Sequence, residues 1–216
     1  MKIEEQVSVI ITAYNERKNI QRVLDRVSIC DFIDEIVVVD DGSIDKTADI
    51  VSRYSRVKLI KLKTNQGKGA AIVAGINSAS HDLLLFLDAD LLGLTRDHLL
   101  ELLAPLVYFN NAKLALGLFG LKDINSTNLA SRMFPAITGQ RAIRKSSLPK
   151  LSDLEKSNYG VDLLIYRAVP RKERIKVILK GLSQVIKERK TDKPMKAVKQ
   201  RIKMYRDIAK SAKNNK

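Results

Sequence analysis

Two aspartates stand one residue apart directly after an apolar run, in the stretch LLLFLDADLLG from Leu83 to Gly93. Side chains of an extended segment alternate between two faces, so Asp88 and Asp90 point to the same side. Burying two carboxylates without a partner is costly, so the pair requires a cation. Oxygen ligands suit Mg²⁺ or Mn²⁺, which leave coordination positions open for phosphate oxygens. The pair predicts a metal-diphosphate site; the alternative is an N-cap for the following helix, formed by Asp90 or Thr95.

Two further polar stretches are candidates for ligand binding. VVVDDGSIDKTADI contains Asp41, whose carboxylate can accept from a nucleobase N–H or a ribose hydroxyl, although Ser43 or Asp45 could cap the next helix. NQGKGAA places glycines around Lys68 at a predicted helix start, where backbone N–H groups and a lysine attract an anion. The chain has neither a P-loop nor a GxGxxG after its first strand, which disfavours an ATPase or a Rossmann dehydrogenase.

Apolar strands alternate with helical patterns through the first half of the chain. This alternation predicts an α/β fold with a mostly parallel central sheet and helices on both faces. Ligands of such sheets bind at the carboxyl ends of the strands, where these polar motifs fall. The predicted strands span 7–11, 35–39, 57–62, 83–87 and 113–118, and the predicted helices span 16–28, 45–54, 70–78 and 96–109.

Composition sets the class of protein. The chain has 216 residues, of which 45% are hydrophobic, and this suits one globular domain with an appendage. Its one cysteine, Cys30, permits no internal disulfide and fits a reducing compartment. The first residues lack the features of a signal peptide, and no apolar run approaches the roughly 20 residues of a membrane span. These features predict a cytoplasmic protein, or one that is peripheral on the inner face of the cell membrane.

Charge is concentrated at the end of the chain. Residues 1–170 carry 22 Lys and Arg against 20 Asp and Glu, whereas residues 171–216 carry 17 against 4, a net +13. We therefore predict a domain over 1–170 and a basic amphipathic helical tail over 171–216. Three readings stay open: packing on the domain or on a second subunit of a homodimer, binding to an anionic membrane, and binding to nucleic acid. The two predicted apolar helix faces contain Ile175, Ile178, Leu179, Leu182, Val185 and Ile186, and then Met195, Val198, Ile202, Tyr205, Ala209 and Ala212.

Four stretches resemble, in order, the family 2 glycosyltransferases with the GT-A fold: VSVIITAYNE, EIVVVDDGSIDKTADI, NQGKGAAIVAGI and LLLFLDADL. The resemblance covers roughly the first half of the chain. It implies a GT-A domain that transfers a sugar from a UDP- or GDP-linked donor. It also implies that Asp88 and Asp90 hold Mg²⁺ or Mn²⁺ together with the donor diphosphate, whose developing negative charge the cation stabilises. By resemblance, the nucleotide pocket is lined by Thr12, Tyr14, Glu16 and Asp41.

The second half resembles the family less closely. PAITGQRAIRK, over 135–145, looks like the acceptor-side loop that precedes a helix in polyprenyl-phosphate sugar synthases. This implies a phosphate contact from Arg141 or Arg144, with Gln140 completing the metal shell. The alternative is that Arg144 and Lys145 lie on a solvated helix face.

A further acid follows in NYGVDLLIYRA. This stretch resembles the final catalytic motif of the family and a YGVE-like stretch of glucosyl-3-phosphoglycerate synthases. Inverting members use such an acid as general base on the acceptor hydroxyl, which implies that role for Asp162. Val161 stands where the family has another acid, so the base assignment and the stereochemistry stay open.

The sequence therefore predicts a glycosyltransferase with a lipid-linked or other phosphorylated acceptor. A small soluble acceptor such as a phosphoglycerate is the alternative. A sugar nucleotidylyltransferase would carry a glycine- and arginine-rich loop after the first strand, where this chain has TAYNE. A nucleic-acid-binding protein would not need acids clustered at the sheet edge, and aromatic residues for base stacking make up only 5% of the chain.

Overall fold

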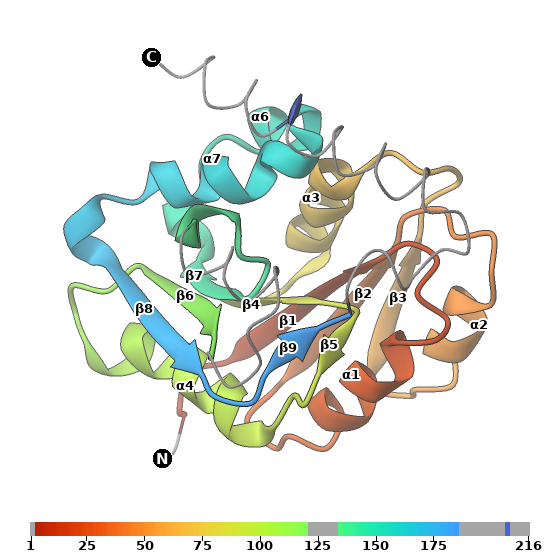
Figure 1. Ribbon diagram of the computed structural model, residues 1–216, viewed down its shortest axis with the longest axis horizontal. Coiled ribbons are helices and arrows are strands. Elements are labelled where there is room, and N and C mark those ends of the chain that lie inside the picture. Colours follow the sequence, from red (N-terminus) through yellow and green to blue (C-terminus); the bar gives the residue numbers. More distant parts are fainter. Residues whose placement is uncertain (1–2, 121–133, 186–205, 208–216) are drawn as a thin grey trace.

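A seven-stranded sheet forms the centre of the computed structural model, which describes residues 3–120, 134–185 and 206–207 (Figure 1). The strand order is β3-β2-β1-β4-β7-β6-β8, and β5 and β9 form a separate two-stranded sheet. The strands are β1 Val7–Ala13, β2 Glu35–Asp40, β3 Val57–Lys61, β4 Leu83–Asp88, β5 Leu91–Leu92, β6 Leu114–Phe119, β7 Arg141–Arg144, β8 Arg174–Leu179 and β9 Ser183–Gln184.

The first four strands are parallel and end at one edge of the sheet. Thr12 of β1 lies opposite Asp88 of β4, and Ala13 lies opposite Asp40 of β2. β7 runs antiparallel to both β4 and β6, and β8 runs parallel to β6. The predicted mostly parallel sheet is therefore confirmed, and the polar motifs after its first four strands meet at one edge.

Helices cover both faces of the sheet, as Figure 1 shows. One core contains the apolar sides of α1 and α4 together with alternate residues of β1, β2 and β4. The second core lies on the opposite face, beneath α3, α6 and α7. The apolar residues whose helical spacing predicted these helices are the residues buried in the two cores. The helices are α1 Ile20–Val27, α2 Thr47–Val51, α3 Lys68–Ser78, α4 Arg96–Tyr108, α6 Leu151–Lys156 and α7 Val161–Ala168.

The predicted helix with an apolar face over 175–186 is wrong. Arg174–Leu179 form strand β8, which adds to the edge of β6, and Ser183–Gln184 form β9. Leu179 is buried while Ile178 is exposed, an alternation that a strand produces and a single helix face does not. The sheet thus continues beyond residue 170, the predicted domain boundary.

Two other expectations meet different outcomes. The stretch 135–145 contains strand β7, Arg141–Arg144, between β4 and β6, and the 3-10 helix Lys145–Ser147 and helix α6 follow it. Arg144 therefore lies on a strand and not on a solvated helix face. The second predicted tail helix, from Met195 to Ala212, lies outside the described residues apart from 206–207. Within the described part of the chain, no helix is long and apolar enough to cross a membrane.

The strand assignment of β8 predicts unequal effects at two neighbouring positions. Leu179→Ala should lower the free energy of unfolding by about 2–5 kcal/mol, because the side chain is fully buried in the core. Ile178→Ala should change it by less than about 0.5 kcal/mol, because that side chain faces outward. Urea denaturation measures both values. Similar losses would contradict the strand and favour the helix, in which both residues share a face.

Candidate active site

Asp88 is the last residue of β4, and groups from three separate parts of the chain lie against its carboxylate. Lys68 Nζ, at the start of α3, lies 3.3 Å from Asp88 Oδ1. Gln140, just before β7, donates from Nε2 to Asp88 Oδ2 at 2.7 Å. A Cβ atom on Gly139 would lie 2.2 Å from Asp88 Oδ2, so the chain can approach this closely only because that residue is glycine.

Gln184 joins the two predicted metal ligands. Its Nε2 donates to Asp90 Oδ1 at 2.6 Å and to Asp88 Oδ2 at 3.1 Å. A single nitrogen atom thus lies within hydrogen-bonding distance of both carboxylates, which shows that they converge on one point. Asp90 itself is buried, with 4% of its surface exposed.

A buried ionic network lies beside this point. Lys68 Nζ is 2.9 Å from Asp162 Oδ2, and Arg141 Nη2 is 2.5 Å from Asp162 Oδ1. Burial by itself lowers the pKa of Lys68, but the neighbouring carboxylates of Asp162 and Asp88 outweigh it and raise that pKa above its usual value. Lys68 is therefore charged at neutral pH and holds the acids of β4 and α7 together.

The two arginines of 135–145 are both paired with acidic side chains of the chain. Only 1% of the Arg141 side chain is exposed, and it donates to Asp162 and to the carbonyl oxygen of Thr138. The structure therefore shows Arg141 as a buried partner of Asp162. Arg144 pairs in register with Leu83, at the opposite end of β4, and forms ion pairs with Glu5 and Asp82. This places Arg144 away from the residues around Asp88.

Asp41 closes the loop that precedes Lys68. Its carboxylate accepts from the backbone N–H groups of Gln66 at 2.7 Å and Gly67 at 2.9 Å, and from Asn65 Nδ2 at 3.0 Å. Burial raises the pKa of Asp41, these two backbone hydrogen bonds lower it, and the nearby Asp40 raises it, with a net increase. The anion that this helix start holds in the structure is therefore the chain's own carboxylate.

The other predicted nucleotide-pocket residues lie at the same edge of the sheet. Thr12 is adjacent to the end of β4 through its register with Asp88. Tyr14 follows β1 and is 42% exposed. Glu16 accepts from Asn19 Nδ2 at 2.7 Å and anchors the turn into α1. The structure thus brings these residues to the edge that carries Asp41 and Asp88.

Two participants were missed from the sequence. Gln184 lay within a predicted helix, so nothing placed it beside Asp88. Asn158 accepts the Lys68 backbone N–H at 3.3 Å, and its φ of 50° identifies an unusual turn. The available signal in the sequence was the asparagine itself, because Asn adopts the left-handed backbone region more readily than most residues other than glycine.

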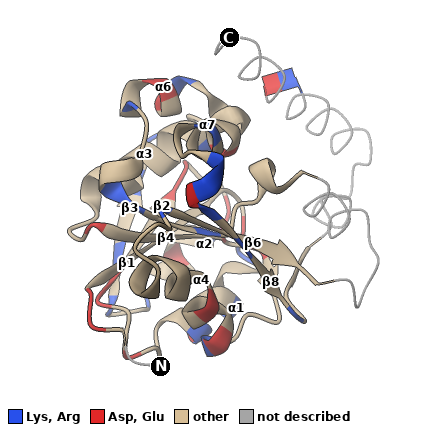
Figure 2. Cartoon of the chain, turned by 90° about the vertical axis from the view of Figure 1, so that its left-hand side faces the viewer, with Lys and Arg blue, Asp and Glu red and all other residues tan. Residues whose placement is uncertain are grey.

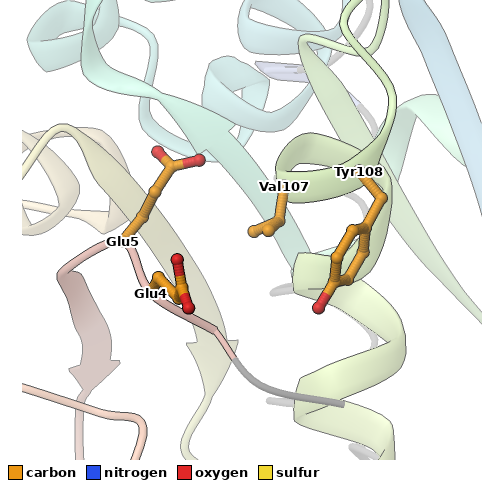
Figure 3. Close-up of a pocket in the computed structure, with 4 residues that line it drawn as sticks. All are labelled: Glu4, Glu5, Val107 and Tyr108. Carbon is orange, nitrogen blue, oxygen red and sulfur yellow. The ribbon is translucent and has the colours of Figure 1, made fainter.

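Figure 3 shows a hollow at the other end of the sheet, of about 460 Å³, lined by Glu4, Glu5, Val107 and Tyr108. It lies beside the segment that leads into β1, whereas the residues around Asp88 lie where β1 ends. Its two acids repel a diphosphate. The hollow is therefore not part of the candidate site.

The residues at the sheet edge fit a divalent cation of the nucleotide-binding type. Within the described ranges, no group of three or more His, Cys, Asp or Glu side chains is arranged to hold a metal. Mg²⁺ in nucleotide sites needs only one or two protein carboxylates, because phosphates and water supply the other ligands. Asp88 and Asp90 converge on one point and provide such a pair. Lys68 adds a fixed positive charge beside it.

The ionic network predicts a large effect on stability. Asp162→Asn should lower the free energy of unfolding by about 3–5 kcal/mol, because it leaves the buried charges of Lys68 and Arg141 without their shared carboxylate. Asp153→Asn, on the exposed side of α6, is the control and should cost less than about 0.5 kcal/mol. Chemical denaturation compares them. Equal values would show that the network contributes nothing to folding.

Two relatives match part of the chain in sequence. An undecaprenyl-phosphate 4-deoxy-4-formamido-L-arabinose transferase of Edwardsiella ictaluri is 43% identical over 94 residues, which are 39% of this chain and 29% of that protein. A dolichyl-phosphate β-glucosyltransferase of Mus musculus is 34% identical over 101 residues, 40% of this chain and 31% of that protein. The matches thus span less than a third of the length of these relatives.

Solved structures share the fold. A crystal structure of glucosyl-3-phosphoglycerate synthase from Mycobacterium tuberculosis, in complex with phosphoglyceric acid, superposes with a TM-score of 0.74 at 19% identity. The superposition covers 97% of this chain and 79% of that one. The same synthase in complex with Mn²⁺, UDP-glucose and glycerol 3-phosphate gives a TM-score of 0.72 at 19% identity.

A sequence model of one family spans most of the chain. It matches residues 8–162, which run from the second residue of β1 to Asp162 in α7 and include the motifs at the edge of the sheet. The chain belongs to glycosyl transferase family 2.

Proposed function

We propose that the chain transfers a sugar from a nucleotide-sugar, UDP- or GDP-linked, to a phosphorylated acceptor. The observation that carries this proposal is the convergence of Asp88 and Asp90 on one point beside the charged Lys68. A bound Mg²⁺ or Mn²⁺ would supply electrostatic stabilisation of the departing diphosphate. Asp88 and Asp90 would hold that cation.

The nucleotide would lie over the loops after β1 and β2. Tyr14 offers an exposed aromatic ring there. Thr12 lies near the end of β1, and Glu16 lies in the loop that follows this strand. We assign the nucleobase contact to Asp41, as the family resemblance implies. Its carboxylate already accepts three N–H groups, and two carboxylate oxygens offer about four lone-pair positions. One further donor, from the base, can therefore be accepted.

We keep Asp162 as the proposed general base for an acceptor that reacts through a hydroxyl, as a phosphoglycerate would. A lipid phosphate would react through a phosphate oxygen, which is largely ionised at neutral pH and needs no base. The oxygens of Asp162 are paired with Lys68 and Arg141, and each oxygen has a second lone pair that can accept the hydroxyl proton. The acceptor would then approach beside Lys68, whose positive charge also attracts a phosphate. This geometry favours acceptors that carry a phosphate near the reacting hydroxyl or are themselves a phosphate.

Two acceptor classes remain, each favoured by one comparison. The names of the sequence relatives give undecaprenyl-phosphate and dolichyl-phosphate acceptors. The structural neighbours are glucosyl-3-phosphoglycerate synthases. We favour the lipid phosphate, because the sequence relatives are 34–43% identical over 39–40% of this chain while the structural neighbour is 19% identical.

The distribution of charge supports an acceptor at a membrane. Positions of basic and of acidic residues are interspersed along the described ribbon in Figure 2. Residues 171–216 carry the net charge of +13. Part of this segment forms β8 and β9. We therefore propose that its remainder, residues 186–216 with 12 Lys and Arg against 3 Asp and Glu, binds anionic lipid at the inner face of the cell membrane and brings the site close to a lipid acceptor. Packing against a second copy of the chain is the alternative.

Loss of either proposed metal ligand should abolish transfer. Asp88→Asn and Asp90→Asn should each lower the transfer rate at least about 100-fold, because a neutral amide no longer holds the cation that stabilises the leaving group. Asp97→Asn, an exposed acid of α4, is the matched control and should retain full activity. Radiolabelled UDP-glucose and GDP-mannose are tested with undecaprenyl phosphate and with 3-phosphoglycerate. Full activity in folded Asp88→Asn or Asp90→Asn would refute the metal role, and transfer to phosphoglycerate alone would select the soluble acceptor.

Membrane binding is tested separately from catalysis. The full chain should sediment with vesicles rich in phosphatidylglycerol at low salt, since each Lys or Arg near such a surface contributes about 1 kcal/mol. Binding should weaken as salt is raised, because the Debye length falls to about 8 Å at 0.15 M. Phosphatidylcholine vesicles are the control. A chain that stays in the supernatant at low salt would assign the basic segment to protein packing.

A further inference from the structure

Gln184 lies outside the residues that the family model matches, yet it touches the centre of the site. The match ends at residue 162, and Gln184 is the second residue of β9. Its Nε2 lies 2.6 Å from Asp90 Oδ1 and 3.1 Å from Asp88 Oδ2. An N–H₂ group therefore stands at the point where the two carboxylates converge.

We propose that Gln184 is a third protein group of the cation site. Its amide holds the two carboxylates together before the cation binds, and it turns its oxygen Oε1 toward the cation afterwards. Two carboxylates without a cation need a hydrogen-bond donor, whereas the cation needs another oxygen. A half-turn of the terminal amide exchanges the N–H₂ group for the oxygen, and this torsion is soft. The inference rests on the proposed function, which supplies the cation.

The backbone around Gln184 is tied to the segment that carries Asp90. β9 pairs with β5, which follows Asp90 directly, so that Gln184 lies opposite Leu91. The N–H of Val185 also donates to the carbonyl oxygen of Asp90 at 3.1 Å. Leu182 is buried in the core, with 2% of its surface exposed. The amide and the carboxylates that it bridges therefore keep a fixed separation.

A second tie comes from α4. His98 is buried, and its Nδ1 accepts the backbone N–H of Thr95 at 3.2 Å, which leaves Nε2 to carry the proton. Nε2 then donates to the carbonyl oxygen of Lys180 at 2.9 Å. The backbones of Gly93 and Gly181 are so close that a Cβ on Gly93 would lie 2.6 Å from Gly181 oxygen. The turn between β8 and β9 is thus held against the start of α4.

The alternative is that Gln184 only fills the site in the absence of a ligand and competes with the cation. The two possibilities predict opposite signs. If Gln184 competes, Gln184→Ala frees the carboxylates and Mn²⁺ binds more tightly. If Gln184 contributes to the site, Gln184→Ala weakens Mn²⁺ binding about tenfold, as loss of a supporting group does at metal sites. Gln184→Glu, which supplies a carboxylate at the same reach, should bind Mn²⁺ at least as tightly as the wild type.

Electron paramagnetic resonance of Mn²⁺, titrated into the full chain with and without UDP, measures these affinities without turnover. Ser183→Ala is the matched control, because it lies on the same strand and its side chain points to the other face. Weaker binding in Gln184→Ala, with Gln184→Glu and Ser183→Ala at or above the wild-type affinity, would support the proposal. Unchanged or tighter Mn²⁺ binding in Gln184→Ala would overturn the proposal. If Gln184→Ala does not fold, weaker Mn²⁺ binding in Gln184→Glu would overturn it instead.

The same titration separates this inference from the proposed function. Loss of Mn²⁺ binding in Asp90→Asn, together with wild-type binding in Gln184→Ala, would refute the role of Gln184 alone. Equal Mn²⁺ binding by the wild type and Asp90→Asn would refute the cation site and the role of Gln184 together.

Discussion

The pairing of Lys68 with Asp162 and Asp88 joins three elements that lie far apart in the sequence. Lys68 begins α3, Asp88 ends β4 and Asp162 lies in the first turn of α7. Arg141 of β7 completes the network from beneath. A lysine that is buried between carboxylates stays charged, and a charge in a poorly solvated place acts more strongly than one in water. The network thus orders the site and provides the field in which a diphosphate would be held.

The backbone N–H groups at the start of α3 already have acceptors within the chain. Such a start usually offers free N–H groups to a phosphate, but here Asp41 and Asn158 accept those of Gln66, Gly67 and Lys68. The lysine side chain therefore supplies the positive charge that the backbone no longer offers. Two separate segments hold this loop through these hydrogen bonds, which position the start of α3 and with it Lys68.

The sequence predicted those parts of the molecule that depend on local pattern. The strands up to β4 are β-branched or leucine-rich runs followed by polar motifs, so their ends and their common edge could be predicted. The partners of Asp162 could not, because Arg141 and Lys68 reach it across 21 and 94 residues of sequence. The prediction for the segment of β8 was wrong for another reason, because its apolar residues fit a helical spacing as well as an alternating one. Only the open edge of β6, a tertiary feature, decides in favour of a strand.

The short strand β9 lies late in the chain, and this has a consequence for synthesis on the ribosome. The motifs of β1 to β4 emerge and can begin to fold first, as segments of a growing chain generally do. Gln184 emerges only after β7, α7 and β8 have followed. A nascent chain that ends at Asp162 therefore has the acids of the site but not the amide that joins them. Because of the order of translation, the site lacks this amide until β9 has been made.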